Sequence, residues 1–96
     1  MDTRLISYRV KAGLADENER LIRGVFAELD KARPGNLGYF AVRAADDAFF
    51  HLVMAQRRPS PLMALPAFEN FQANISERLL ASPEIREVTL VGAYRR

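Results

Sequence analysis

Two stretches of the chain repeat large apolar residues at steps of three and four, the spacing of a helix with one buried face. The first helix is predicted over residues 17–33, where Asp16 and Glu19 have the spacing of a capping box and Pro34 ends the helix. The second is predicted to begin at Pro66 and to end after residue 80. The apolar positions are Leu21, Ile22, Val25, Phe26 and Leu29 in the first helix, and Leu65, Phe68, Phe71, Ile75 and Leu79 in the second.

Four other stretches are typical of β-strands: residues 4–11, 37–44, 49–56 and 85–94. The connection between the second and third strands is so short that these two strands must form an antiparallel hairpin. The order is strand, helix, strand, strand, helix, strand, and crossovers are right-handed. The pattern therefore predicts a single α+β domain over residues 1–96, a ferredoxin-like sandwich with a four-stranded antiparallel sheet and both helices on one face.

The third and fourth predicted strands are apolar on both sides and do not alternate polar with apolar residues. A strand of this kind is normally covered on both faces of its sheet. The two helices can cover one face, and no further element is predicted for the other. We therefore expect a homodimer in which a second subunit covers the outer face.

Composition excludes several classes of site. The chain of 96 residues has no cysteine, which rules out disulfides, thiolate metal sites and a cysteine nucleophile. The net charge of +2 comes from 14 basic and 12 acidic side chains spread along the sequence, so no nucleic-acid partner is expected. No apolar run approaches the roughly 20 residues that span a bilayer, and no signal peptide is evident. We expect a cytoplasmic protein without a membrane contact.

Three aromatic side chains on the predicted strands are candidates for chemistry. His51, the one histidine, could move a proton near neutral pH or could simply hydrogen-bond within a half-buried sheet. Tyr8 and Tyr39 could present phenols to a pocket, although tyrosine is also an ordinary strand residue. One histidine without cysteine leaves only carboxylates as further metal ligands, so no metal site is expected.

The second predicted helix offers candidate ligand contacts. Asn74 lies on the flank of the apolar stripe, where an amide that faces the sheet needs a hydrogen-bond partner, and the alternative is an amide that faces solvent. Phe68 and Phe71 are core residues by default and would line any pocket between the sheet and the helices.

A family resemblance is carried by four segments: the strand at residues 5–10, the Asp16-x-x-Glu19 helix start, His51-Leu52-Val53, and above all Leu65-Pro66-Ala67-Phe68-Glu69-Asn70-Phe71-Gln72. Together they resemble the antibiotic biosynthesis monooxygenase family of dimeric α+β barrel proteins. The resemblance implies two packed sheets in a homodimer and a pocket between sheet and helices. Active members oxidise quinol-like or polyketide aromatics without a metal or flavin, so no cofactor is expected.

Three features separate the chain from the haem-degrading members of this family, which it matches poorly. Its second predicted helix has no histidine, and the chain has no tryptophan. Ser7 takes the place of an asparagine that the resemblance implies near the N-terminus.

Three functions stay open on these grounds. In the first, a monooxygenase uses His51, Tyr8 or Tyr39 to remove a phenolic proton, so that the resulting anion passes an electron to oxygen. Its substrate contacts would be Asn74, Phe71, Phe68 and Ser7. In the second, the same pocket binds a small ligand without turnover. In the third, Phe68, Phe71 and Phe26 fill the interior and the protein is a structural dimer.

Overall fold

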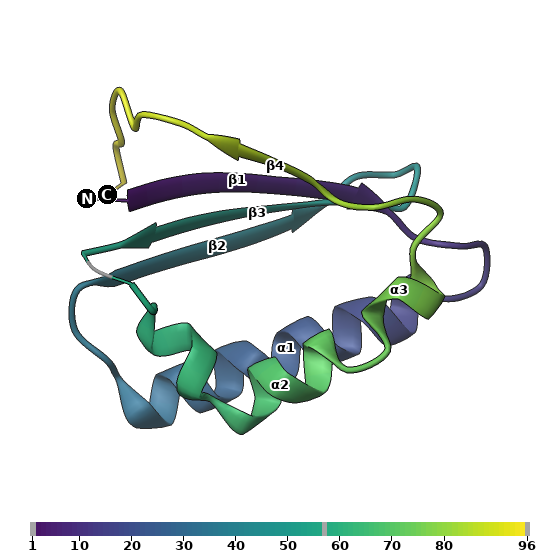
Figure 1. Cartoon of the computed structure of the whole chain (residues 1–96), viewed down its shortest axis with the longest axis horizontal. Helices are drawn as coiled ribbons and strands as arrows, with labels where there is room; N and C mark the ends of the chain where they lie inside the picture. Colours follow the sequence, from purple (N-terminus) through teal and green to yellow (C-terminus); the bar gives the residue numbers. More distant parts are fainter. Residues whose placement is uncertain (1, 57, 96) are drawn as a thin grey trace.

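A computed structural model describes residues 2–56 and 58–95 and shows an antiparallel sheet with all helices on one face (Figure 1). The strands, in the spatial order β2-β3-β1-β4, are β1 (Asp2–Arg9), β2 (Leu37–Arg43), β3 (Ala48–Ala55) and β4 (Glu84–Glu87). The helices are α1 (Ala15–Ala32), the 3₁₀ turn η1 (Pro61–Ala64), α2 (Pro66–Gln72) and α3 (Ile75–Arg78). The predicted ferredoxin-like α+β fold, including the β2–β3 hairpin, is confirmed.

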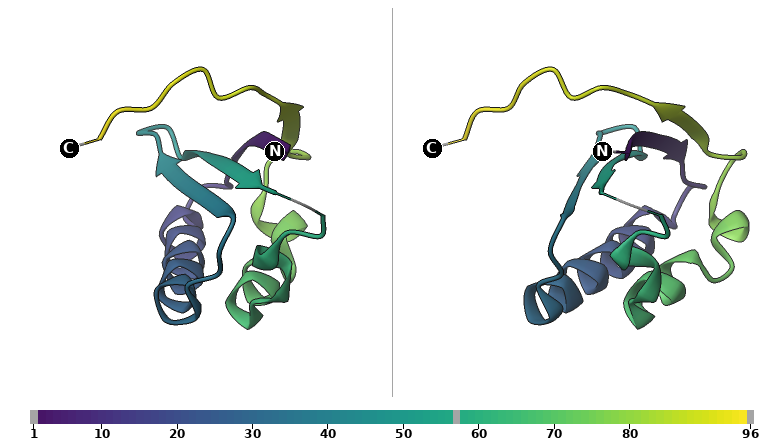
Figure 2. Two further views of the ribbon diagram at one scale, coloured as in Figure 1. Left: turned by 90° about the vertical axis from the view of Figure 1, so that its left-hand side faces the viewer. Right: turned by 60° about the vertical axis from the view of Figure 1, so that its left-hand side comes forward.

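The inner face of the sheet is built by alternate residues of the three longer strands. On β3 these are Phe49, His51 and Val53, with Tyr8 of β1 opposite Phe49 and Tyr39 of β2 opposite Val53. Successive strand residues point to opposite faces, so these side chains all lie toward the helices. Figure 2 shows α1 and α2 side by side beneath this face. The core between sheet and helices therefore contains several aromatic rings, including those of Tyr8, Tyr39 and Phe49.

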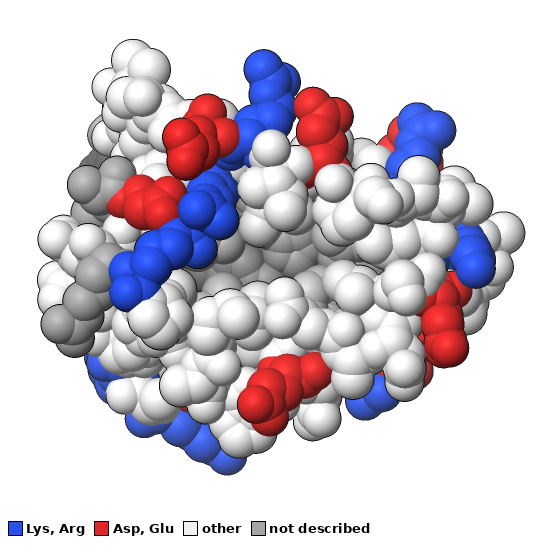
Figure 3. Space-filling view, in the orientation of Figure 1, with Lys and Arg blue, Asp and Glu red and all other residues white. Residues whose placement is uncertain are grey.

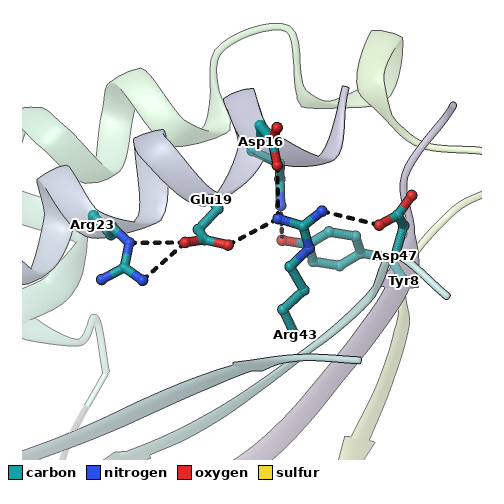
Figure 4. Close-up of polar contacts among 7 residues, drawn as sticks. Tyr8, Asp16, Glu19, Arg23, Arg43 and Asp47 are labelled. Atoms are coloured by element: carbon teal, nitrogen blue, oxygen red, sulfur yellow. Dashed lines mark hydrogen bonds and ion pairs between the residues drawn. The ribbon is translucent and has the colours of Figure 1, made fainter. Parts of the chain in front are cut away.

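The predicted capping box at the start of α1 is wrong. The N-cap residue is Leu14, and no side chain caps the helix. The Asp16 and Glu19 carboxylates instead accept hydrogen bonds from Arg43 of β2, at 3.0 and 2.9 Å, and Asp47 adds a third at 3.1 Å (Figure 4). Hydrogen bonds between charged partners are stronger than neutral ones. The Arg43 guanidinium accordingly lowers the pKa of Glu19 and ties α1 to the hairpin.

The predicted second helix is broken in the middle. Between α2 and α3, Asn74 adopts left-handed dihedrals (φ 58°), which asparagine tolerates better than most residues. Arg78 stabilises the break, because its guanidinium folds back and donates to the carbonyls of Phe71 and Ala73 at the end of α2. Helix-terminal carbonyls lack partners within the helix, so this side chain takes the role of a C-cap.

The last predicted strand is much shorter than residues 85–94. In the register of β4 on β1, Glu87 lies opposite Arg4, and the next ladder contact is the Val88 N–H, which donates to the Thr3 carbonyl at 3.0 Å. One residue further along β4, the same register brings Thr89 opposite Asp2, the first described residue of β1. The residues after Thr89 therefore have no described strand residue beside them. Residues 89–95 therefore extend away from the sheet (Figure 2).

The outer face of the sheet carries apolar side chains that nothing in the described chain covers. Phe40 is 51% exposed, Val42 61% and Phe50 37%. Val42 and Phe50 are direct cross-strand partners, so the exposed residues form one patch on β2 and β3, which we call the outer patch (Phe40, Val42, Phe50). None of the helices within the described ranges combines the length and the hydropathy of a membrane-spanning segment.

Candidate functional site

A line of hydrogen-bonded polar side chains crosses the core between the sheet and the helices. Tyr39 Oη lies 2.7 Å from His51 Nδ1, and Tyr8 Oη lies 2.8 Å from His51 Nε2. Asn18 of α1 donates from Nδ2 to Tyr8 Oη at 3.0 Å, and Arg78 of α3 donates from Nε to Asn18 Oδ1 at 3.1 Å. All five residues are buried, and we call them the core network.

The sheet register places the three strand residues of this network. Tyr8 is paired with Phe49 and Tyr39 with Val53, so each tyrosine is a diagonal neighbour of His51 on the same face. Diagonal neighbours are within reach when both side chains are long. One imidazole on the central strand β3 can therefore contact a phenol on either side with its two ring nitrogens.

Aromatic rings enclose the network. Five rings, three of which belong to network residues, form a stacked row in the order Phe49, Tyr8, His51, Tyr39 and Phe26. The successive centroid distances are 5.7, 5.4, 5.7 and 4.8 Å. Phe71 of α2 closes the row from the helix side, 5.6 Å from the His51 ring. These separations are in the range that favours aromatic pairs.

Burial sets the charge state of the titratable groups. It lowers the pKa of His51 to about 4 and raises the pKa of Tyr8 to about 12. Burial also raises the pKa of Tyr39, with the neighbouring Tyr8 adding to the effect. The imidazole and both phenols are consequently neutral at pH 7, and the positive charge of the network resides on Arg78.

A pH titration of stability tests this charge state. The His51 pKa is lower in the folded chain than the ordinary value of 6.5, so the unfolded chain binds the extra proton first as the pH falls. We expect about 3 kcal/mol of unfolding free energy to be lost between pH 6.5 and pH 4 through this group. Urea denaturation at a series of pH values measures the loss. His51→Gln, which stays uncharged, is the control and should lack it; an equal slope in both proteins would contradict the assignment.

The structure brings together some of the sequence-predicted site residues and separates others. His51, Tyr8 and Tyr39 meet in the network, and Phe71 and Phe68 pack beside it with ring centroids 6.1 Å apart. Ser7 follows the alternation of β1 to the outer face, where it borders a hollow with Phe50 and Leu80. The Asn74 side chain is exposed at the helix break and does not face the sheet.

Two members of the network, Asn18 and Arg78, were not predicted from the sequence. Asn18 is completely buried, and it precedes Ile22 by four residues and Val25 by seven, which places it on the apolar stripe of α1. Arg78 follows Phe71 by seven residues on the other stripe. A polar residue in phase with an apolar stripe is the signal that could have found both.

The network approaches the surface at its Tyr39 end. A hollow of about 210 Å³ there is lined by Phe26, Leu29, Arg33, Pro34, Leu37 and Tyr39. His51 itself is only 3% exposed. Within residues 2–56 and 58–95, no three His, Asp or Glu side chains gather as they would around a metal ion. Figure 3 shows acidic and basic side chains intermixed on the face that carries β4, so this face has no patch of one sign.

Comparison with known proteins identifies the fold. No protein-family model and no curated protein matches the sequence. A "putative antibiotic biosynthesis monooxygenase" from Bacteroides thetaiotaomicron superposes with a TM-score of 0.81 over 99% of this chain and 95% of its own, at 15% identity. Proteins of the same description from Nitrosomonas europaea (TM-score 0.76, 10% identity, 94% and 89% covered) and Caulobacter crescentus (0.74, 17%, 95% and 90%) are also similar. The chain thus has the antibiotic biosynthesis monooxygenase fold, as its sequence resemblance indicated.

Proposed function

We propose that the protein is a homodimeric, cofactor-independent oxygenase of a small electron-rich aromatic compound such as a quinol. The observation that carries the proposal is His51 hydrogen-bonded through both ring nitrogens to buried phenols, inside an otherwise apolar aromatic interior. A hydrophobic core does not need such a group for stability, and buried polar networks with shifted pKa values concentrate at functional sites. The fold shared with proteins described as putative monooxygenases agrees with this reading.

The charge state of the network favours hydrogen-bond donation over proton removal. An imidazole with a pKa of about 4 is a weak base at pH 7 and does not hold a substrate proton. A neutral phenol of the network can instead donate to the oxygen of the substrate, which favours the phenolate form. The substrate loses its phenolic proton to water, and the phenolate passes one electron to dioxygen. Recombination of the phenoxyl radical with superoxide forms the new C–O bond of a peroxide anion, which takes up a proton and loses water to leave a quinone. The substrate supplies the electrons of this step.

The direct test is oxygen uptake by the purified protein with a panel of hydroquinones and multi-ring phenols. Consumption of oxygen that depends on the folded protein, together with an oxygenated product by mass spectrometry, is the expected result. A chelator should leave the rate unchanged if no metal takes part. Failure of the whole panel to support uptake would contradict the enzyme proposal.

A non-catalytic dimer of the same fold is the second candidate, and the enclosure of His51 favours it. If the rings of Phe71 and its neighbours keep the interior closed, the network only stabilises a specific core. A thermal shift with the aromatic panel but without oxygen uptake would identify a binding protein, and the absence of both would identify a structural dimer.

The outer patch supports the dimer part of the proposal, and the introduction of a charge into this patch is a test. We expect Val42→Asp to convert a dimer into a monomer, because Val42 lies beside Phe50 and an unpaired carboxylate buried against a second sheet is strongly unfavourable. Light scattering at micromolar concentration measures the mass. Gln72→Asp, on the exposed side of α2, is the control and should stay dimeric. A monomeric mass for the unmodified protein would contradict the dimer.

A further inference from the structure

The core network begins with Arg78, whose guanidinium can only donate hydrogen bonds. A guanidinium has no hydrogen-bond acceptor, so Asn18 must turn its Oδ1 toward Arg78 Nε, 3.1 Å away. Two further donations from Arg78, to the carbonyls of Phe71 and Ala73, hold the guanidinium in place. The amide nitrogen of Asn18 therefore faces Tyr8 and donates to its hydroxyl oxygen at 3.0 Å. The orientation of this amide follows from the chemistry of its neighbour.

The direction set by Arg78 passes through Tyr8 to His51. Because the Tyr8 oxygen already accepts from Asn18, its own proton is free to be donated, and His51 Nε2 lies 2.8 Å away. In the opposite arrangement Nε2–H would also donate to Tyr8, and the Tyr8 proton would be enclosed with no acceptor among the described residues. The arrangement in which Tyr8 donates also leaves one phenol proton unmatched, that of Tyr39. In that arrangement, however, all four hydrogen bonds run in one direction, from Arg78 to Tyr39, and hydrogen bonds in such a chain strengthen one another. The arrangement in which Tyr8 donates is therefore favoured.

A neutral imidazole carries one proton, and burial keeps His51 neutral. With Nε2 accepting from Tyr8, the proton lies on Nδ1, which donates to Tyr39 Oη at 2.7 Å. The Tyr39 hydroxyl proton then has no partner within residues 2–56 and 58–95. Tyr39 is also the network residue that borders the hollow formed with Phe26 and Arg33.

We infer that Arg78, acting through Asn18, is a positioning residue that fixes His51 as the Nδ1–H tautomer and makes the Tyr39 hydroxyl the free donor of the network. The direction of the network also deepens the proposed function, because it assigns Tyr39, and not Tyr8, as the phenol that donates to a ligand oxygen. Only this assignment of Tyr39 to a ligand rests on the proposed function. The ligand class that suits this end is a small aromatic with an anionic or carbonyl oxygen.

The single histidine makes the tautomer directly measurable. Protein labelled with ¹⁵N only at histidine gives one imidazole, and long-range ¹H–¹⁵N correlation at pH 7 distinguishes a protonated from an unprotonated ring nitrogen. The expected spectrum has Nδ1 protonated and Nε2 unprotonated. A spectrum of the unmodified protein with Nε2 protonated would overturn the inference, whatever the variants do.

Asn18→Asp is the variant that should reverse the network with little change of shape. The new carboxylate still accepts from Arg78 but can only accept from Tyr8, so Tyr8 must donate toward α1 and receive from His51. We expect Nε2 to become protonated. Asn70→Asp, which adds the same charge on the exposed side of α2, should leave Nδ1 protonated. A folded Asn18→Asp protein with an unprotonated Nε2 would refute the role given to Asn18 and Arg78.

The outcomes for the inference and for the proposed function are separate. An Nδ1–H imidazole in a protein that consumes no oxygen supports the direction of the network and contradicts the oxygenase. Oxygen consumption with an Nε2–H imidazole contradicts the direction of the network and supports the oxygenase. If the protein has the Nδ1–H imidazole and also consumes oxygen, Asn18→Asp should lower oxygen uptake, because in the reversed network the Tyr39 proton is donated to His51.

Discussion

Tyr39→Phe should lower kcat/KM for oxygen uptake by about 10²-fold, the effect of removing one hydrogen-bond donor from a developing oxyanion. The ring stays in place between Phe26 and His51, so the stacked row is conserved and only the hydroxyl is lost. His51 Nδ1–H then lacks its acceptor, and we expect a smaller loss of stability, about 1 kcal/mol. Initial rates with an oxygen electrode measure the first effect, and thermal unfolding measures the second.

Tyr94→Phe is the matched control, because it removes the same hydroxyl from a tyrosine that is 78% exposed in the C-terminal segment. It should keep the full rate. A Tyr39→Phe protein with unchanged kcat/KM would remove Tyr39 from the reaction and leave the network with a structural role. A loss confined to KM would indicate that the hydroxyl contributes to substrate binding and not to the chemical step.

Arg78→Met should have the largest effect on stability among single changes in the network, about 3 kcal/mol, because three acceptors lose their donor at once. These are Asn18 Oδ1 and the carbonyls of Phe71 and Ala73. For a domain of this size the melting temperature should fall by roughly 15 °C. Differential scanning calorimetry measures the change.

Arg20→Met is the control for the lost charge, since the Arg20 side chain is 70% exposed and, among the residues that the structure describes, pairs only with Glu17 on the surface of α1. It should change the melting temperature by no more than about 2 °C. Equal shifts in the two variants would show that Arg78 contributes little beyond its charge, and would contradict the capping role that we assign to it at the end of α2.

The sequence was sufficient to predict the fold because the spacing of apolar residues distinguishes helices from strands and shows which face of each is buried. The alternation in β1 and the three-four spacing in α1 follow directly from which face each element buries. Two of the errors occurred where a distant residue overrode a local rule. Asp16 and Glu19 have capping-box spacing but bind Arg43, and the uninterrupted apolar stripe across Asn74 concealed a break that Arg78 stabilises.

The candidate site was predicted in part for a related reason. His51, Tyr8 and Tyr39 are conspicuous as residue types, and the alternation of strand residues allows all three to lie on one face of the sheet. Asn18 and Arg78 enter the network from helices, and their contacts depend on how α1 and α3 sit against the sheet. Strand pairing has a fixed period of two, whereas the rotation and depth of a helix depend on packing. The sequence could therefore predict the first group more easily than the second.

In the proposed homodimer, the extended C-terminal segment would link assembly to resistance against proteolysis. Residues 89–95 lie outside the sheet, and Val91 is 98% exposed. An extended, exposed and partly apolar stretch is the conformation in which proteases cleave a chain. A second copy that covered this segment would withdraw it from attack. Digestion rates that fall as protein concentration rises would then report subunit association, and unassembled subunits would be degraded first.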